Sequence, residues 1–471
     1  MDQAEGDVTE IEEGVLRSGS SRSPKRSSQG DQGDQREVYR EIREVREKEP
    51  LGSPTQITHI DADQVKALEA THVLRTYRRA PVVFVRGEGT RLYDAAGRSY
   101  LDFISGIGVV VLGHGHRGLA EAVSKQAETL IQTSNLFYHP LQGQLAERLA
   151  ALSGLQRTFF CNSGAEAIEA CLKFARRYWF SQGEKQRTRF VALQHGFSGR
   201  TMGALSVTAN PHYREPFEPL IPGVTFVSPD DPAALEAAVS PETAAIIAEP
   251  IQGEGGVRPL SRELAAAIER ACERHGTLFI ADEVQCGLGR TGEAFFFPVL
   301  GLTPDLIAVG KALGSGVPIG AALVSERVAA QIFAGDHGST YGGNLLSTRA
   351  GLYVLEQLTG TRDAKPYAPP AGLIGHVREI ASVFEDALDR LAAEHAIVTA
   401  SRGVGVMRAL ELTIDATPVV EGALKAGLLV NRTAERVVRM LPPLTVTKAE
   451  IDEAAGILDR VLSGVRTEVT T

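Results

Sequence analysis

The stretch FIADEVQCGLGRTGEAFFFPVLGLTPDLIAVGKAL, residues 279–313, decides the fold that this sequence predicts. It contains two short apolar runs bounded by turn signals, which is typical of strands buried on both faces of a parallel sheet. Asp282 closes the first run, and Lys311 follows the second. Because open α/β sheets bind ligands at the carboxyl ends of their strands, we expect the acid and the amine to face one crevice. A surface ion pair beyond two strand ends is the alternative.

Short apolar segments continue in both directions from this stretch and alternate with helical ones. Strands are predicted at residues 157–161, 191–194, 224–227, 244–248, 277–281 and 305–309. Helical patterns, such as residues 164–180 and 261–276, separate several of them, and this alternation indicates βαβ units. The predicted fold class is therefore α/β, with a large, doubly wound, mostly parallel sheet domain and a small α+β domain built from both chain ends.

Four segments are predicted along the chain. Residues 1–56 are rich in Ser, Gln, Asp, Glu and Arg and are expected to be a disordered charged tail. Residues 57–130 form the N-terminal part of the small domain and contain a helix and an antiparallel meander. Residues 131–350 form the large domain, and residues 351–471 complete the small one.

The composition, net charge and cysteine spacing of the chain argue against several classes of function. The 471 residues are 43% hydrophobic and 23% charged, as in an ordinary soluble globular protein, and no apolar run is long enough to span a membrane. We therefore expect a cytoplasmic protein. A formal net charge of −9 argues against a nucleic-acid partner. The four cysteines have no C-x-x-C spacing, and His114 and His116 have no neighbouring ligand at metal-binding spacing, so no metal site is predicted.

A glycine motif at Gly113, Gly115 and Gly118 follows an apolar run and precedes a helical pattern. This is the context of a dinucleotide-binding fingerprint. That fingerprint also needs an acid about twenty residues after the first glycine, and no Asp or Glu lies between Glu128 and Glu147. A nicotinamide cofactor is therefore disfavoured.

A second loop, Cys161 to Ala165, lies between a predicted strand and a helix. Free N–H groups at such a helix start can bind a phosphate, and Ser163 would add a hydroxyl donor. A plain N-cap at Ser163 is the alternative. The loop HGSTYGGN, residues 337–344, either completes a phosphate site or is only a turn.

A phosphate beside Asp282 and Lys311 would define a chemistry. A lysine amine can form a Schiff base with an aldehyde cofactor, and an acid opposite it can keep a pyridine nitrogen protonated. Such a ring stabilises a carbanion, and the lysine can then move a proton. This is the chemistry of transamination.

Six motifs occur in the order and spacing of class III pyridoxal-phosphate-dependent aminotransferases. They are SGAEAIEA (163–170), FSGRT (197–201), EPIQGEGG (249–256), DEVQCGLGRTG (282–292), VGKALGSGVPIGA (309–321) and HGSTYGGN (337–344). The resemblance covers about residues 62–465 and implies the type I fold of pyridoxal-phosphate-dependent transferases. It is closest to the acetylornithine and ornithine aminotransferases, partly through GLLVNRTAERVVRMLPPL (427–444).

The resemblance implies roles for individual residues. Lys311 resembles the Schiff-base lysine, and Asp282 resembles the partner of the ring nitrogen. The other implied cofactor contacts are Ser163, Gly164 and Ala165 at the phosphate, Phe197 on the ring face, Gln285 at the phenolic oxygen, and Thr340 from the neighbouring subunit of a homodimer. The implied substrate contacts are Arg200 and Arg439 for carboxylates, Glu254 masking Arg439, and Ser339.

The implied reaction moves the terminal amino group of N-acetylornithine to 2-oxoglutarate. Ornithine, succinylornithine, 4-aminobutyrate or a lysine-pathway amine are the alternative donors. An aminomutase or a non-catalytic, cofactor-binding scaffold is a more distant alternative. Ser198 departs from the family, where a ring is common at this position, and is expected to leave more room above the cofactor.

Overall fold

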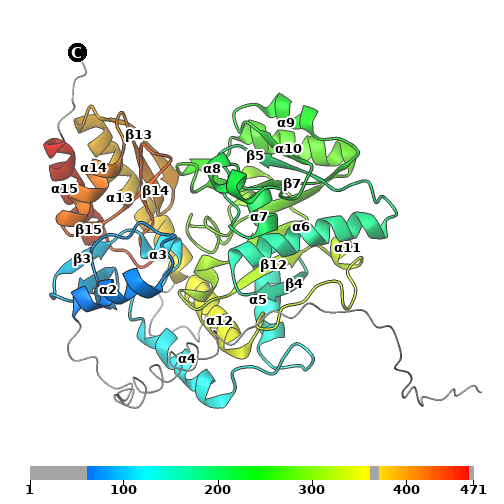
Figure 1. The fold of residues 1–471 in the computed structure, drawn as a ribbon, viewed down its shortest axis with the longest axis horizontal. Helices are drawn as coiled ribbons and strands as arrows, with labels where there is room; N and C mark the ends of the chain where they lie inside the picture. The colour runs from blue at the N-terminus through cyan, green and yellow to red at the C-terminus, as the bar shows by residue number, and fades with distance from the viewer. Residues whose placement is uncertain (1–60, 361–370, 466–471) are drawn as a thin grey trace, which may run out of the picture. The chain divides into compact units, whose positions relative to one another are not determined.

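A seven-stranded sheet forms the centre of the large domain, in the order β4, β12, β11, β10, β7, β5, β6 (Figure 1). The computed structural model describes residues 61–360 and 371–465, so the predicted tail lies outside the described residues. β12 runs antiparallel to β11 and β4, and the other pairs are parallel, which confirms the predicted sheet. The strands are β4 (Arg157–Cys161), β5 (Arg189–Leu193), β6 (Val224–Val227), β7 (Thr243–Ala248), β10 (Leu278–Asp282), β11 (Leu306–Val309) and β12 (Gly320–Val324).

Helices cover both faces of this sheet because its inner strands are apolar on both faces. Successive residues of β10, Phe279 and Ile280, belong to two different buried clusters. The cluster of Ile280 includes Phe174 of α6, and the cluster of Phe279 includes Leu264 of α10. The helices of this domain are α5 (Gln142–Ser153), α6 (Gly164–Ser181), α7 (Met202–Ser206), α8 (Pro211–Arg214), α9 (Pro232–Ala238), α10 (Arg262–His275), α11 (Glu326–Ala329) and α12 (Leu345–Thr359).

Strand β12 was not among the predicted strands. Its sequence, Gly-Ala-Ala-Leu-Val, is dominated by small residues that carry little strand propensity. Its pairing with both β11 and β4 decides its conformation. The other strands of the sheet lie within a few residues of their predicted positions.

The small domain joins both ends of the described chain. Its antiparallel sheet has the order β13, β14, β17, β16, and a second sheet has the order β1, β2, β3, β15. β15 pairs in parallel with β3, which links the C-terminal part of the chain to the predicted N-terminal meander. The strands are β1 (Phe84–Glu88), β2 (Arg91–Asp94), β3 (Ser99–Asp102), β13 (Val398–Val404), β14 (Met407–Leu412), β15 (Leu428–Leu429), β16 (Asn431–Thr433) and β17 (Val437–Met440).

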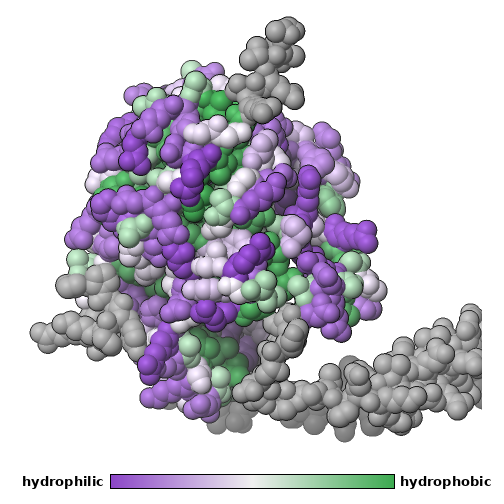
Figure 2. Space-filling view, turned by 90° about the vertical axis from the view of Figure 1, so that its left-hand side faces the viewer, coloured by the Kyte–Doolittle hydropathy of each residue, from purple (hydrophilic) through white to green (hydrophobic). Residues whose placement is uncertain are grey.

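The helices outside the large domain are α2 (Ala62–His72), α3 (Ser105–Gly108), α4 (Arg117–Thr129), α13 (Gly372–Glu394), α14 (Thr417–Lys425) and α15 (Lys448–Gly464). Figure 2 views the side of the molecule that carries α15, and hydrophilic side chains cover most of this face. The predicted fold class, with a small α+β domain built from both chain ends, is confirmed. The residue limits of the domains stay predictions.

The apolar run before the glycine motif, residues 107–112, forms no strand, and the turn that leads into it is left-handed. Ser105, Gly106, Ile107 and Gly108 all have positive φ, from 43° to 74°. A branched residue such as Ile107 is rarely found in this region. The run therefore lacks the strand that a dinucleotide fingerprint requires.

The two histidines of this region have structural contacts. His114 Nε2 lies 2.7 Å from Asp102 Oδ2, and the His116 side chain accepts a hydrogen bond from Leu119 N–H at the start of α4. Among the described residues, no helix combines the length and apolar character needed to cross a membrane.

Candidate active site

Asp282 and Lys311 lie at the carboxyl ends of two neighbouring parallel strands. Asp282 is the last residue of β10 and pairs with Ala308 of β11, and Lys311 follows β11 after one glycine. Lys311 has a φ of +37°, a conformation that costs free energy and is concentrated at functional sites. Within the described part of the chain, no ion pair joins the two side chains, so the surface ion pair considered as the alternative does not form.

The start of α6 lies against both strand ends. A Cβ on Gly310 would lie 3.0 Å from both the N and the Cα of Gly164. A Cβ on Gly164 would lie 2.5 Å from Cγ1 of Val284, two residues after Asp282. Neither glycine has room for a side chain, so the backbones of Gly310 and Gly164 meet directly and the Val284 side chain packs on the Gly164 backbone. The first turn of α6, Asp282 and Lys311 are thereby held in one small region.

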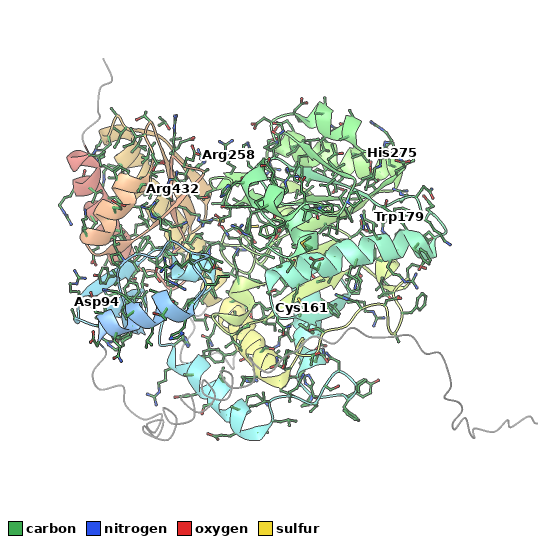
Figure 3. The ribbon with its side chains drawn as sticks, viewed as in Figure 1. Asp94, Cys161, Trp179, Arg258, His275 and Arg432 are labelled. Atoms are coloured by element: carbon green, nitrogen blue, oxygen red, sulfur yellow. The ribbon has the colours of Figure 1, made fainter. Side chains whose placement is uncertain are left out.

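Ser163 is the N-cap of α6. Its Oγ accepts a hydrogen bond from Glu166 N–H at 3.2 Å, and Cys161, labelled in Figure 3, closes β4 two residues earlier. The first N–H groups of a helix have no acceptor within the helix, and those of Gly164 and Ala165 belong to this set. The cap therefore leaves donors for an anion, and the phosphate site stays a prediction.

A second buried acid, Glu249, lies beside Asp282. Glu249 follows β7 and accepts hydrogen bonds from Phe197 N–H at 2.8 Å and from Gly253 N–H at 3.1 Å. Burial, followed by the charge of Asp282, raises the pKa of Glu249 to about 8. Burial also raises the pKa of Asp282, to about 6. At neutral pH the negative charge of this pair therefore resides mainly on Asp282.

The Lys311 amine lies in the same buried environment as Asp282 and Glu249. Burial lowers the pKa of its amine, while the charges of Asp282 and Glu254 act in the opposite direction. The neutral amine is the form that attacks an aldehyde and accepts a proton. The surroundings of Lys311 thus favour a reactive lysine.

Ser198 lies near Asp282. Burial raises the pKa of that carboxyl, and the Ser198 side chain acts weakly in the opposite direction, after Val284 N–H and the charge of Lys311. The preceding residue, Phe197, is held through its backbone by Glu249. Ser198 N–H donates to Thr208 Oγ1 at 3.0 Å, and the extra room above the cofactor stays a prediction.

A buried ion pair lies at the small-domain side of the site. Arg439 of β17 donates through Nη1 to Glu254 Oε1 at 2.6 Å and to Gln285 Oε1 at 3.1 Å. Glu254 lies in the loop between β8 (Ile251–Gln252) and β9 (Arg258–Pro259). Burial would raise the pKa of Glu254, but the charge and hydrogen bond of Arg439 outweigh it, so the pKa is lowered. Both groups are therefore charged at neutral pH.

Arg200 has a different environment from Arg439. Its side chain is exposed, and its guanidinium carbon lies 3.5 Å from the ring centroid of Tyr213 and 5.7 Å from that of Phe197. Stacking on an aromatic ring leaves the N–H groups at the edge of a guanidinium available to a carboxylate. Of the two predicted carboxylate-binding arginines, Arg200 is therefore exposed and Arg439 is buried.

The loop that contains Ser339 and Thr340 lies against the start of α6. Ser339 Oγ accepts hydrogen bonds from Asn162 Nδ2 at 3.3 Å and from Gly342 N–H at 2.9 Å. The Thr340 side chain is exposed, and its carbonyl accepts a hydrogen bond from Gln132. Ser339 is therefore close to the phosphate-type turn of its own chain, while Thr340 is turned to the surface.

Comparisons with known proteins identify the family. The Aminotransferase class-III family model matches residues 73–462. The chain belongs to the class III aminotransferases. Acetylornithine aminotransferase of Archaeoglobus fulgidus is 45% identical over 390 residues, which are 83% of this chain and 98% of that protein. The enzyme of the same name from Methanocaldococcus jannaschii is 42% identical over 402 residues, which are 85% of this chain and 98% of that protein.

A solved structure agrees with this aminotransferase family. Ornithine aminotransferase from Toxoplasma gondii has a TM-score of 0.79 and 31% identity, and the match covers 89% of this chain and 97% of that one. That structure reveals partial occupancy of PLP at its active site. The predicted class III membership, the type I fold and the pyridoxal-phosphate-dependent aminotransferase class are confirmed.

Three side chains of this aminotransferase site were not predicted. Glu249 had a usable signal, because it follows an apolar strand just as Asp282 closes one. Asn431 accepts a hydrogen bond from Arg439 Nε at 3.2 Å, and Thr433 donates one to the carbonyl of Glu254 at 2.6 Å. These two contacts depend on strand pairing, and no local pattern marks them.

Proposed function

We propose that this chain transfers the terminal amino group of N-acetylornithine to 2-oxoglutarate, forming the N-acetylated semialdehyde and glutamate. Relatives at 42–45% identity over most of the chain carry the name acetylornithine aminotransferase. The observation that carries the proposed chemistry is the convergence of Asp282, Lys311 and the start of α6 at the carboxyl edge of the sheet. Ornithine is the second candidate donor, because the solved relatives include ornithine aminotransferases at 31% identity.

The residues present fit pyridoxal phosphate. Gly164 and Gly310 have no room for side chains, so the start of α6 can contact a phosphate through its backbone. Asp282, whose buried carboxylate needs a positive partner, suits a protonated ring nitrogen. The remaining contacts proposed from the family motifs are Ser163 and Ala165 at the phosphate, Phe197 on the ring face, Gln285 at the phenolic oxygen and Lys311 at the aldehyde. When bound, the cofactor supplies an electron sink for the carbon that carries the reacting amine.

The chain's own groups then have distinct tasks. Asp282 keeps a negative charge at the far end of the ring, and Glu249 fixes the backbone of Phe197 beside it. Lys311, with its lowered pKa, would accept a proton from the amine-bearing carbon of the substrate and deliver it to the aldehyde carbon of the bound cofactor. One water molecule is needed to release the product, because its oxygen becomes the aldehyde oxygen while the nitrogen is retained for transfer to 2-oxoglutarate.

The two arginines divide the recognition of carboxylates. Arg200 is exposed and suits the carboxylate that both substrates carry. Arg439 suits the second carboxylate of 2-oxoglutarate, and Glu254 neutralises it when the amine donor offers none. Ser339 lies near enough to the start of α6 to line the same site.

A homodimer is part of this proposal. The loop of Thr340 is bound by Asn135, whose Nδ2 donates to the carbonyls of Ser339 and Gly342 at 3.0 and 2.9 Å. The residues directly after Asn135 are the exposed Leu136, Phe137 and Tyr138. A second subunit covering this apolar segment would also meet Thr340, which could then reach the phosphate of the partner's site.

The test is glutamate formation by the purified protein with pyridoxal phosphate, 2-oxoglutarate and one amine at a time. We expect N-acetylornithine to give the highest kcat/KM among N-acetylornithine, ornithine, succinylornithine and 4-aminobutyrate. A higher value for another amine would reassign the donor, and no turnover with any of them would contradict the function.

Replacement of the proposed attachment lysine tests the site itself. Lys311→Ala should lose the visible absorbance of the bound cofactor and at least 100-fold in kcat, about the contribution of acid–base catalysis alone. Lys425→Ala, an exposed lysine at the end of α14, is the matched control and should behave as the parent. A Lys311→Ala protein with the parent's rate would exclude the assignment.

A further inference from the structure

Strand β16 presents two side chains to the buried ion pair. β16 pairs antiparallel with β17, with Asn431 opposite Arg439 and Thr433 opposite Val437. Since side chains alternate along a strand, Asn431 and Thr433 share one face. Arg432, labelled in Figure 3, projects from the other face and binds Asp415 through Nη2 at 2.6 Å. Only the first face of β16 therefore acts on Arg439 and Glu254.

Asn431 fixes the guanidinium. Its Oδ1 accepts a hydrogen bond from Arg439 Nε at 3.2 Å, while Arg439 Nη1 is bound to Glu254 and Gln285. Contacts at both ends of a planar guanidinium define its orientation. The arginine is thus held in place by groups other than the acid it pairs with.

Thr433 anchors the acid. Its Oγ1 donates to the backbone carbonyl of Glu254 at 2.6 Å and lies 3.5 Å from Glu254 Oε2. Thr433 is buried, so this hydroxyl has little competition from water. The anchor sets the place from which the Glu254 side chain reaches Arg439.

The two partners of the ion pair differ in their freedom to move. The Arg439 side chain is 1% exposed, while that of Glu254 is 34% exposed. Glu254 and Thr433 also line a crevice of about 690 Å³, together with Phe197. The pair can therefore open by movement of Glu254 into this space while Arg439 stays in place.

We infer that Asn431 and Thr433 are positioning residues that set how readily Glu254 yields Arg439 to a substrate carboxylate. The inference rests on the proposed function, because it takes Arg439 as the site of the second carboxylate. Asn431 favours the open arrangement by keeping Arg439 oriented for a new partner. Thr433 favours the closed one by holding Glu254 within reach of Arg439. Together they set the relative efficiency of the two half-reactions, one with the dicarboxylate and one with the amine donor.

Thr433→Val tests the anchor, because it removes the hydroxyl and nearly keeps the volume. The expected result has opposite signs for the two substrates. Glutarate, a dicarboxylate that cannot be transaminated, should bind the holoenzyme about fivefold more tightly by calorimetry, the size of one hydrogen bond. The amine half-reaction should lose about fivefold in kcat/KM, because Arg439 is then poorly neutralised.

Asn431→Ala tests the other residue and should act in the opposite direction. Glutarate should bind about fivefold more weakly, while the amine half-reaction changes less than twofold, because Glu254 still neutralises Arg439. Thr399→Val is the control: Thr399 Oγ1 donates to the carbonyl of Glu411 at 3.2 Å elsewhere in the same sheet, and its loss should change neither measurement.

Changes of the same sign in both half-reactions of Thr433→Val, or changes no larger than those of Thr399→Val, would overturn the inference. Arg439→Lys separates this failure from that of the proposed function. If the parent binds glutarate and Arg439→Lys does not, the role of Arg439 holds and only the inference on β16 is rejected. If Arg439→Lys binds glutarate as tightly as the parent, both are rejected.

Discussion

Buried carboxyl groups dominate the chemistry of this site at the scale of single residues. Asp282, Glu283 and Glu249 are each less than 10% exposed, yet each accepts backbone hydrogen bonds. Burial disfavours the charged form of an acid, and backbone N–H donors favour it. Burial prevails at all three, because their pKa values lie above the usual range. Asp282 differs from the other two because the charge of Lys311 lowers its pKa, and in the proposed function the cationic ring would be its second partner.

Glu283 gives a pH dependence of stability. Its Oε1 accepts from Phe296 and Phe297 N–H at 2.7 Å each, and its Oε2 accepts from Cys286 Sγ. Burial raises its pKa from 4.5 to about 7, so between these values the folded protein holds a proton that the unfolded chain lacks. Stability therefore falls as pH rises through this window, by up to about 1.4 kcal/mol per unit from this group.

Glu283→Gln keeps the acceptor for both N–H groups and removes the proton. We expect its thermal midpoint to fall less than that of the parent between pH 5 and pH 7.5. Glu379→Gln, an exposed acid on α13, should follow the parent. Parallel curves for Glu283→Gln and the parent would show that Glu283 does not titrate in this range.

At the scale of secondary-structure elements, close contacts at two glycines join the strands and the helix of the site. The end of β11, the start of α6 and the segment after β10 touch where Gly164 and Gly310 lie. Apolar strand patterns and the cap at Ser163 identify these elements from sequence. Their approach to one another depends on side-chain volume at two positions, and small residues there allow the helix start to reach Lys311.

Gly310→Ala should separate these elements. The new Cβ would lie 3.0 Å from two backbone atoms of Gly164, which cannot move as a side chain does. We expect a loss of about 1–3 kcal/mol from overpacking, seen as a lower thermal midpoint and weaker binding of pyridoxal phosphate in absorbance titrations. Gly143→Ala in α5, where a Cβ meets nothing within 4 Å, should be neutral or slightly stabilising. Unchanged cofactor affinity in Gly310→Ala would refute this account.

The exposed apolar segment before α5 matters at the scale of the whole molecule. Leu136, Phe137 and Tyr138 are 86%, 68% and 106% exposed, although Asn135 binds the loop of Thr340 next to them. Consecutive large apolar side chains on an ordered loop mark an interaction surface. In the proposed function, a second copy of the chain covers this segment and completes the site.

Phe137→Glu should place a charge in that interface and yield monomers. Sedimentation velocity should show the parent as a dimer and the variant at half its mass, with a loss of activity that follows the loss of dimer. Phe180→Glu, which changes another exposed aromatic near the end of α6, should remain dimeric. A dimeric Phe137→Glu protein would place the interface elsewhere.

Local sequence patterns were sufficient to predict much of the fold of this protein. Apolar runs ending in Asp282 and Lys311, helical spacing and the cap at Ser163 act between residues close in sequence, so the strands, most helices and the family follow from the chain alone. The same reasoning applied to β7 would have identified Glu249. Strand β12 was not predicted, because its small residues carry no strand signal until β11 and β4 flank it.

Only the tertiary structure decided the contacts between distant residues. The pairing of β16 with β17 brings Asn431 to Arg439, and the packing of the β8–β9 loop brings Glu254 to both Arg439 and Thr433. The left-handed turn at Ser105 to Gly108 was likewise not marked by any local pattern. Such contacts depend on the register of strands and on which surfaces become buried together. Burial, in turn, shifts the pKa values, so the sequence by itself supplied Asp282, Glu254 and Lys311 as candidates, and the fold decided their contacts and their pKa shifts.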